Sequence, residues 1–196
     1  MSAAAPTPGL TSSQTVGPFF TEALLRDPWN VLVTDGTDGE RIRVEGRVLD
    51  GDGNPVADAL VEIWQANGHG RYNHPLDQRA SLPLDPDFTG FGRAGTDDEG
   101  RFWFETVKPG PVPFDDTRLQ APHLSMTVFA RGMLNHAATR LYFADDPAND
   151  TDPILALVPE RRRGTLLARR DESGESVVYR LDIVLQGRGE TVFFNI

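Results

Sequence analysis

The sequence predicts a mainly β protein with an antiparallel β-sandwich core, on the evidence of three observations. Short segments alternate apolar and polar residues with the period of two that half-buried strands show. The clearest is 41–48, where Arg or Glu at each odd position alternates with Ile, Val or Gly. Dense turn signals separate such segments, for example at 50–55 and 97–100. Helical periods are few, which favours a sandwich.

The remaining elements follow in chain order. Further strands are expected at 60–65, 102–106, 123–130, 139–143 and 179–185. One or two short helices are expected near the C-terminus. Pro153 suits the first position of a helix at 152–157, and Gly164 weakens a second one at 159–169. Long loops complete the prediction, above all residues 66–96, whose length is typical of a functional loop or of one wrapped on a partner.

The chain is expected to form a single domain, with residues 1–40 as an N-terminal arm and residues 41–196 as the sandwich. Breakers interrupt regular structure in the arm: Pro6, Pro8, Gly9, Gly17, Pro18 and Pro28. The arm nevertheless carries large apolar side chains: Phe19, Phe20, Leu24, Leu25 and Trp29. We therefore expect it to pack on its own domain or on a partner. The apolar residues 191–194 at the other end need a similar contact.

Composition is that of an ordinary globular protein and excludes several functions. Hydrophobic residues make up 39% of the 196 residues, enough for a substantial core. A formal charge of -10 disfavours nucleic acid as a partner. The absence of cysteine excludes disulfides, thiolate metal sites and cysteine nucleophiles. Residues 1–8 have neither a basic region nor an apolar run, and no apolar stretch is long enough for a membrane span, so a cytoplasmic location is expected.

Among the chemistry-bearing residues, His123 has the most distinctive placement. Period-two alternation puts His123 and Ser125 on one face of a strand. Two histidines so placed could hold a metal, but a serine is a poor ligand. Tyr72 could add a phenolate oxygen, whereas Val112 offers a metal nothing. The other histidines, the acidic residues and the glycine-rich segments form no recognisable catalytic motif, and they are read as surface or hydrogen-bonded residues.

Several motifs together resemble the intradiol ring-cleavage dioxygenases. The longest are Val-Glu-Gly-Arg-Val-Leu-Asp at 44–50 and Val-Glu-Ile-Trp-Gln-Ala-Asn at 61–67. Shorter matches extend the resemblance: Gly-Asn-Pro-Val at 53–56, Gly-Arg-Tyr at 70–72, Thr-Asp-Asp-Glu-Gly at 96–100, Lys-Pro-Gly-Pro at 108–111, Arg-Leu-Tyr-Phe at 140–143 and Tyr-Arg-Leu-Asp-Ile at 179–183. The resemblance covers most of the chain from Thr11 onward.

The resemblance implies a β-sandwich fold. It also implies that this chain lacks part of the iron site of the active family members. Active members hold a non-haem ferric ion with two tyrosines and two histidines, and use O2 to cleave a catechol between its hydroxyls. Tyr72 and His123 match the first ligand of each kind, while Val112 and Ser125 stand at the second positions. We therefore expect no metal and no catalytic residue in this chain. Some members pair an iron-bearing β chain with a degenerate α chain, and this sequence looks like the latter.

The implied role is that of an α subunit in an αβ protomer of a larger oligomer. The Fe(III) of the partner β chain would cleave 3,4-dihydroxybenzoate to 3-carboxy-cis,cis-muconate, in the β-ketoadipate pathway of aromatic degradation. The α chain would lend Gly17, Pro18 and Arg131 to the substrate site at the shared interface. Arg131 has the same parity as His123, so an unbroken strand would put both on one face. A guanidinium is a natural partner for the substrate carboxylate.

Two alternatives remain open at the level of sequence. One is a self-sufficient intradiol dioxygenase with an atypical iron site, completed by water or substrate. The other is a non-enzymatic module that resembles transthyretin or a carbohydrate-binding domain. The second alternative leaves the long loop and both aromatic termini unexplained.

Overall fold

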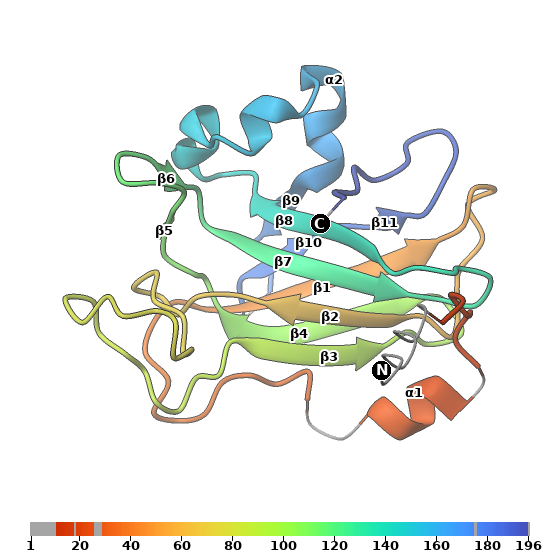
Figure 1. Cartoon of the computed structure of the whole chain (residues 1–196), viewed down its shortest axis with the longest axis horizontal. Coiled ribbons are helices and arrows are strands. Elements are labelled where there is room, and N and C mark those ends of the chain that lie inside the picture. Colours follow the sequence, from red (N-terminus) through yellow and green to blue (C-terminus); the bar gives the residue numbers. More distant parts are fainter. Residues whose placement is uncertain (1–10, 18, 26–28, 175, 196) are drawn as a thin grey trace, which may run out of the picture.

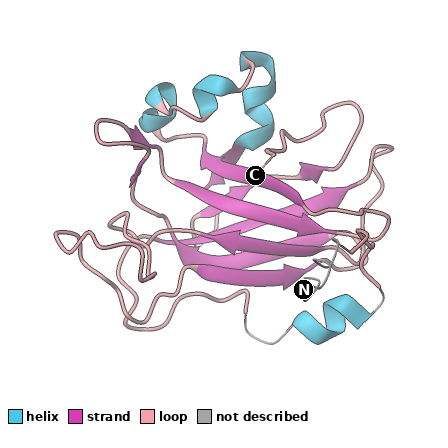
Figure 2. Ribbon diagram, viewed as in Figure 1, coloured by secondary structure: helices cyan, strands magenta, loops and turns pink. Residues whose placement is uncertain are grey.

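The structure is a computed structural model that describes residues 11–17, 19–25, 29–174 and 176–195. Strands dominate it (Figures 1 and 2): β1 (Arg41–Leu49), β2 (Leu60–Trp64), β3 (Phe91–Gly95), β4 (Arg101–Val107), β5 (Val112–Pro113), β6 (Leu119–Gln120), β7 (His123–Phe129), β8 (Ala137–Phe143), β9 (Leu167–Asp171), β10 (Val178–Arg180) and β11 (Ile183–Val184). The helices are short: α1 (Phe19–Leu24), α2 (Glu160–Arg163) and the 3₁₀ helices η1 (Pro147–Thr151), η2 (Leu155–Leu157) and η3 (Gly164–Leu166). None of the helices in these ranges could span a membrane.

The strands form two layers that share one core, which confirms the predicted β-rich fold class. One layer has the order β3-β2-β7-β8, with every neighbour antiparallel. The other is built around β1, which pairs antiparallel with β4 and parallel with β10 and β11. A short parallel pairing of β8 with β9 joins the layers. The pairing is thus mixed, with parallel strands at three places in a mainly antiparallel fold.

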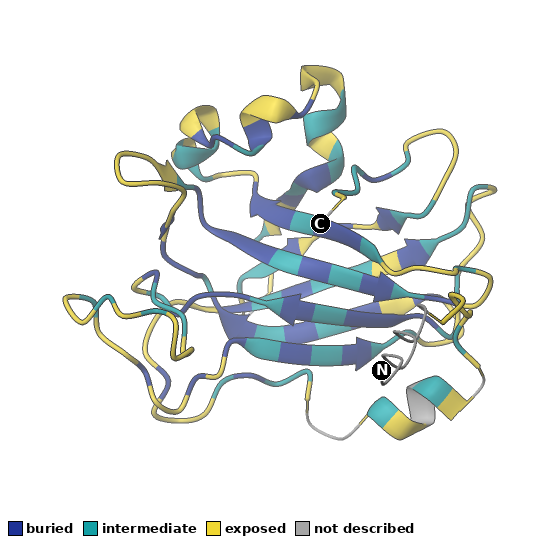
Figure 3. Cartoon of the chain, viewed as in Figure 1, coloured by how far each residue is buried: buried dark blue, intermediate teal, exposed yellow. Residues whose placement is uncertain are grey.

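Alternation of buried and exposed residues explains why these segments pack as a sandwich (Figure 3). In β1 the side chains of Ile42, Val44 and Val48 are buried. They meet apolar side chains of the facing layer, such as Ile63 and Met126, in one core cluster. A smaller cluster lies under the 3₁₀ helices: Ala121, Tyr142, Leu155, Val158 and Leu166.

The last predicted strand, 179–185, is divided into β10 and β11. The division lies at Leu181, whose carbonyl oxygen turns toward β1. A Cβ on residue 46 would lie 1.8 Å from that oxygen, so only glycine fits there. The Leu181 N–H in turn donates to the Glu45 carbonyl at 3.1 Å. The strand is therefore interrupted at Leu181, where its carbonyl group faces Gly46, although β10 and β11 both run alongside β1 in the same parallel register.

The arm contains more regular structure than its proline and glycine residues predict. It contains α1, and Phe20 lies against Phe129 of β7 with ring centroids 5.5 Å apart. Leu32 is buried in the main core, and its N–H donates to the Glu105 carbonyl at 2.8 Å. The arm thus packs on its own domain, as one of the two expectations had it. Several predicted breakers lie outside the described residues: Pro6, Pro8, Gly9, Pro18 and Pro28.

The C-terminal region also departs in detail from the sequence expectation. The helix expected at 159–169 is limited to α2 and the η3 turn, because β9 begins at Leu167. The helix expected at 152–157 is the 3₁₀ helix η2. The apolar C-terminus does find a contact, since the Phe194 N–H donates to the Ala138 carbonyl at 2.8 Å.

Candidate functional site

Tyr72 lies at one end of the sandwich, in a loop whose path depends on the nearby Gly70. Gly70 has a φ of +78°, and a Cβ at this position would lie 2.1 Å from the Pro111 carbonyl oxygen. The long loop can therefore touch the proline-rich segment before β5. Tyr72 then stacks on Trp64 of β2, with ring centroids 5.7 Å apart and planes 9° apart. An open pocket of about 750 Å³ lies here, lined by Trp64, Tyr72, His74, Leu76, Asp77, Gln78, Arg79, Val112, Pro113 and Gln120.

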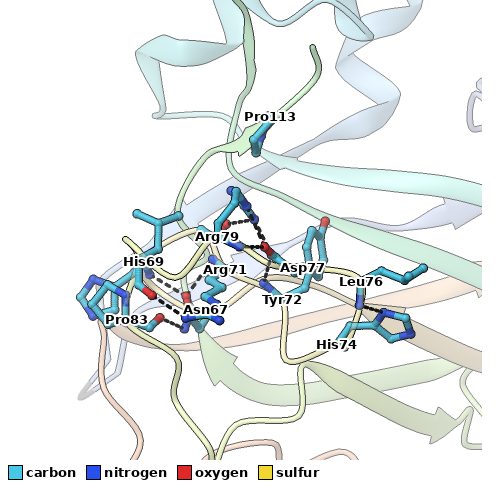
Figure 4. A network of polar contacts seen from close by, with 12 residues as sticks. Asn67, His69, Arg71, Tyr72, His74, Leu76, Asp77, Arg79, Pro83 and Pro113 are labelled. Atoms are coloured by element: carbon cyan, nitrogen blue, oxygen red, sulfur yellow. Dashed lines mark hydrogen bonds and ion pairs between the residues drawn. The ribbon is translucent and has the colours of Figure 1, made fainter. Parts of the chain in front are cut away.

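The Asp77 carboxylate fixes the backbone of Tyr72 at the edge of this pocket by a hydrogen bond (Figure 4). Asp77 accepts the Tyr72 N–H at 2.8 Å and the Arg79 Nη2–H at 2.6 Å. Arg79 also donates to the Gly70 carbonyl at 2.7 Å. The guanidinium beside Asp77 holds the pKa of that carboxyl well below its usual range. Burial raises the pKa of the Tyr72 phenol, so the phenol is neutral at pH 7.

His123 and Ser125 share one face of β7, as the alternation predicts, and strand register gives them neighbours. Ser125 lies between Trp64 of β2 and Arg140 of β8, and His123 lies beside Tyr142. His123 is 5% exposed, and its Nδ1–H donates to the Ala121 carbonyl at 2.8 Å. Burial, helped by the charge of Arg140, lowers its pKa to about 4. The imidazole is therefore neutral at pH 7.

Arg140 is the charged group at the centre of this face. Its Nη1 donates to Gln120 Oε1 at 2.7 Å and to the Tyr142 hydroxyl oxygen at 3.1 Å. The Tyr142 hydroxyl donates onward to Asp152 at 3.2 Å. The same buried carboxylate accepts three backbone N–H groups: Ala121 at 2.7 Å, Ile154 at 2.9 Å and Leu155 at 2.7 Å. Asp152 thereby joins the loop before β7 to the start of η2.

The four positions matched to an iron site lie at this one end of the molecule, but their side chains do not fit ferric iron. Tyr72 and Val112 line the same pocket, and Ser125 neighbours the Trp64 on which Tyr72 stacks. The buried Val112 has no donor atom, and the Ser125 hydroxyl is a poor ligand. Only one phenol and one imidazole remain, too few for a rigid Fe(III) site. Within the part of the chain that the structure describes, no three His, Asp or Glu side chains are placed to hold a metal.

Arg131 lies at the opposite end of β7, and the parity argument for it was wrong. The strand ends at Phe129, so Arg131 belongs to the following turn and does not share the face of His123. Its side chain is 70% exposed and forms an ion pair with Asp58. The Gly132 N–H donates to Thr15 Oγ1 at 2.8 Å, so the arm lies beside this turn.

Of the two arm residues expected at a substrate site, only one is described. Gly17 is exposed and lies two residues after Thr15. Pro18 lies outside the described residues. Figure 1 shows α1 and the end of β7 on one side of the molecule, and the pocket loop between β2 and β3 on the other. The structure therefore separates the candidate substrate residues from the degenerate metal positions.

Sequence reasoning missed Arg140, Gln120 and Asp152. The available signal was the arginine at position 140 inside the apolar strand 139–143, with the same parity as Tyr142. That parity predicts a charged residue beside a phenol on one face. Its location next to Ser125 depends on the β7–β8 register, which no local pattern fixes.

Comparison with known proteins gives a consistent set of matches. A family model described as Dioxygenase matches residues 15–187. The protocatechuate 3,4-dioxygenase alpha chain of Burkholderia cepacia is 45% identical over 199 residues, covering 95% of this chain and 97% of that one. The corresponding beta chain of Burkholderia cepacia is 44% identical over 159 residues, covering 78% and 67%.

A solved structure agrees with the sequence matches. It is the dioxygenase domain of a dioxygenase carbohydrate-binding protein fusion from Streptomyces sp. SirexAA-E. The superposition has a TM-score of 0.63 at 26% identity, and it covers 93% of this chain and 99% of the other. Similarity to the alpha chain thus extends over nearly the whole sequence, and similarity to the beta chain over less of it.

Proposed function

The chain belongs to the intradiol dioxygenases, a family that depends on non-haem iron, and we propose that it is the alpha subunit of a protocatechuate 3,4-dioxygenase. In this proposal it pairs with a homologous beta chain, whose Fe(III) cleaves protocatechuate between its hydroxyls with O2. The observation that carries the proposal is the ligand set. Val112 and Ser125 supply neither the phenolate nor the imidazole that ferric iron needs, although the rest of the fold is kept.

The contribution of this chain is then to the substrate side of the partner's site. Arg131 and Gly17 are both exposed, and the contact of Thr15 with Gly132 joins their segments into one surface. A surface with an exposed guanidinium suits a substrate that carries a carboxylate. Gly17 adds backbone that a ligand can approach closely, because glycine has no Cβ and the space beside it is open. The sequence assigns Pro18 the same role, and this residue lies outside the described ranges.

The two alternative functions explain less. A self-sufficient dioxygenase would need donors at positions 112 and 125. A carbohydrate-binding module would not account for a dioxygenase family match over residues 15–187.

Co-expression with a beta chain tests the proposal. The two chains are expected to co-purify and to consume O2 with protocatechuate, while this chain alone shows no activity. The beta chain alone serves as the matched control, since it isolates what the alpha chain adds. Turnover by this chain in isolation would contradict the proposal, as would a beta chain that neither binds it nor gains activity from it.

A further inference from the structure

Arg140 is a positive charge directly beside Ser125, one of the four former ligand positions. Arg140 of β8 pairs with Ser125 of β7. Two residues further along β8, Tyr142 pairs with His123. The charge of Arg140 acts on both His123 and Tyr72: it adds to the lowering of the His123 pKa by burial, and it opposes the rise that burial causes in the Tyr72 pKa. A guanidinium therefore lies beside one former ligand position and is hydrogen-bonded to the strand neighbour of a second.

Among the residues that the structure describes, no carboxylate is a direct partner of the Arg140 charge. Its two side-chain hydrogen bonds go to Gln120 and Tyr142, which are both neutral. Asp152 is linked to Arg140 only through the Tyr142 hydroxyl. The carboxylate oxygens of Asp152 accept hydrogen bonds from the backbone N–H groups of Ala121, Ile154 and Leu155. Arg140 forms no ion pair within the described ranges. By contrast, Arg79 forms an ion pair with Asp77.

We propose that the Arg140 guanidinium takes the place of the metal ion in this chain, and that it excludes iron even when the missing ligands are restored. The loss of the metal then has two causes, the missing donors and a resident cation. The inference rests on the assignment of Tyr72, Val112, His123 and Ser125 to the ligand positions, made with the proposed function.

The physical reason is electrostatic and steric. A fixed positive charge in a partly buried site repels a ferric ion, because water there screens charges only weakly. The guanidinium is also held through Nη1, which donates to both Gln120 and Tyr142, so a swing into solvent would break both hydrogen bonds. An arginine cannot shed its proton to relieve the repulsion, whereas neutral glutamine at the same position removes it.

Ligand restoration with and without Arg140 tests this inference. The full-length chain carries V112Y/S125H, V112Y/S125H/R140Q or V112Y/S125H/R140K, and each is incubated with iron(III) citrate. The readouts are the iron content per chain and the visible absorption of tyrosinate bound to Fe(III). We expect stoichiometric iron and colour in the R140Q combination alone. The R140K combination is the matched control, since it changes the side chain and keeps the charge.

Two results would overturn the inference. One is iron binding by V112Y/S125H equal to that of the R140Q combination. The other is the absence of iron from the R140Q combination when circular dichroism shows it to be folded. A second pair of variants, S125H and S125H/R140Q, keeps the buried Val112 and so disturbs the core less. Both are tested with Co(II), which should bind to S125H/R140Q and not to S125H. Iron in the chain itself is counted, so a failure of the beta-chain pairing does not affect the outcome.

Discussion

Replacement of Arg131 with alanine is expected to weaken the use of protocatechuate by the assembled enzyme and to leave this chain folded. In the structure the side chain is 70% exposed, and among the described residues it forms an ion pair with Asp58 alone. Exposed ion pairs contribute only about 0.2–1 kcal/mol to folding. The free energy of unfolding should therefore fall by less than ~1 kcal/mol.

The effect on substrate binding should be larger. A hydrogen bond between a guanidinium and a carboxylate contributes about 1.5–3 kcal/mol, which corresponds to a loss of roughly ten- to a hundred-fold in affinity. The carboxylate is remote from the ring bond that is cleaved and is bound similarly before and during the reaction. Most of the loss should therefore appear in KM and little in kcat.

Steady-state O2 consumption by the complex measures both constants. Catechol lacks the carboxylate, so its KM should change far less than that of protocatechuate. Arg118→Ala is the matched control, because Arg118 is 57% exposed, pairs with Asp115 and lies at the other end of the sandwich. An unchanged KM for protocatechuate in the Arg131→Ala complex would refute the assignment and leave Arg131 as a surface residue.

Three further predictions concern stability, each measured by urea unfolding monitored by circular dichroism. Asp152→Ala leaves several buried donors unpaired and should destabilise the chain by about 3–5 kcal/mol; a loss under ~1 kcal/mol would contradict the role of this carboxylate. Gly46→Ala should destabilise by about 1–3 kcal/mol or more, because its Cβ would meet the Leu181 carbonyl, whereas Gly164→Ala, in open space, should be neutral or slightly stabilising. His123 has a pKa of about 4, below its usual value, so the unfolded chain binds more protons than the folded one between about pH 4 and 6.5. Stability should therefore fall as the pH falls through that window, and His123→Gln should flatten the slope; an unchanged slope would contradict the buried neutral imidazole.

The fold was predictable where one face of a strand is apolar. β1 reads directly from its alternation, because its buried side chains recur every second residue. β3 was missed, since Phe91, Gly92 and Gly95 give it no such pattern. Its place is fixed by pairing with β2 and by the ion pair of Arg93 with Glu62 at 2.6 Å, contacts that no local signal predicts.

The candidate site was predictable only in part for the same reason. Period-two alternation placed His123 and Ser125 on one face correctly. The same rule failed for Arg131, because the chain leaves β7 at Phe129 and turns through Gly132, whose φ is +82°. The role of Arg140 depends on strand register, which forms only when β7 and β8 pair.

Iron content of the complex with the beta chain tests the central claim most directly. The alpha chain is used either unchanged or with Tyr72→Phe and His123→Gln, which remove its remaining donors at the ligand positions. The account predicts the same iron content per pair of chains in both complexes, with the same turnover of protocatechuate, since the metal belongs to the partner. A loss of iron from the complex that carries the substituted chain would contradict it.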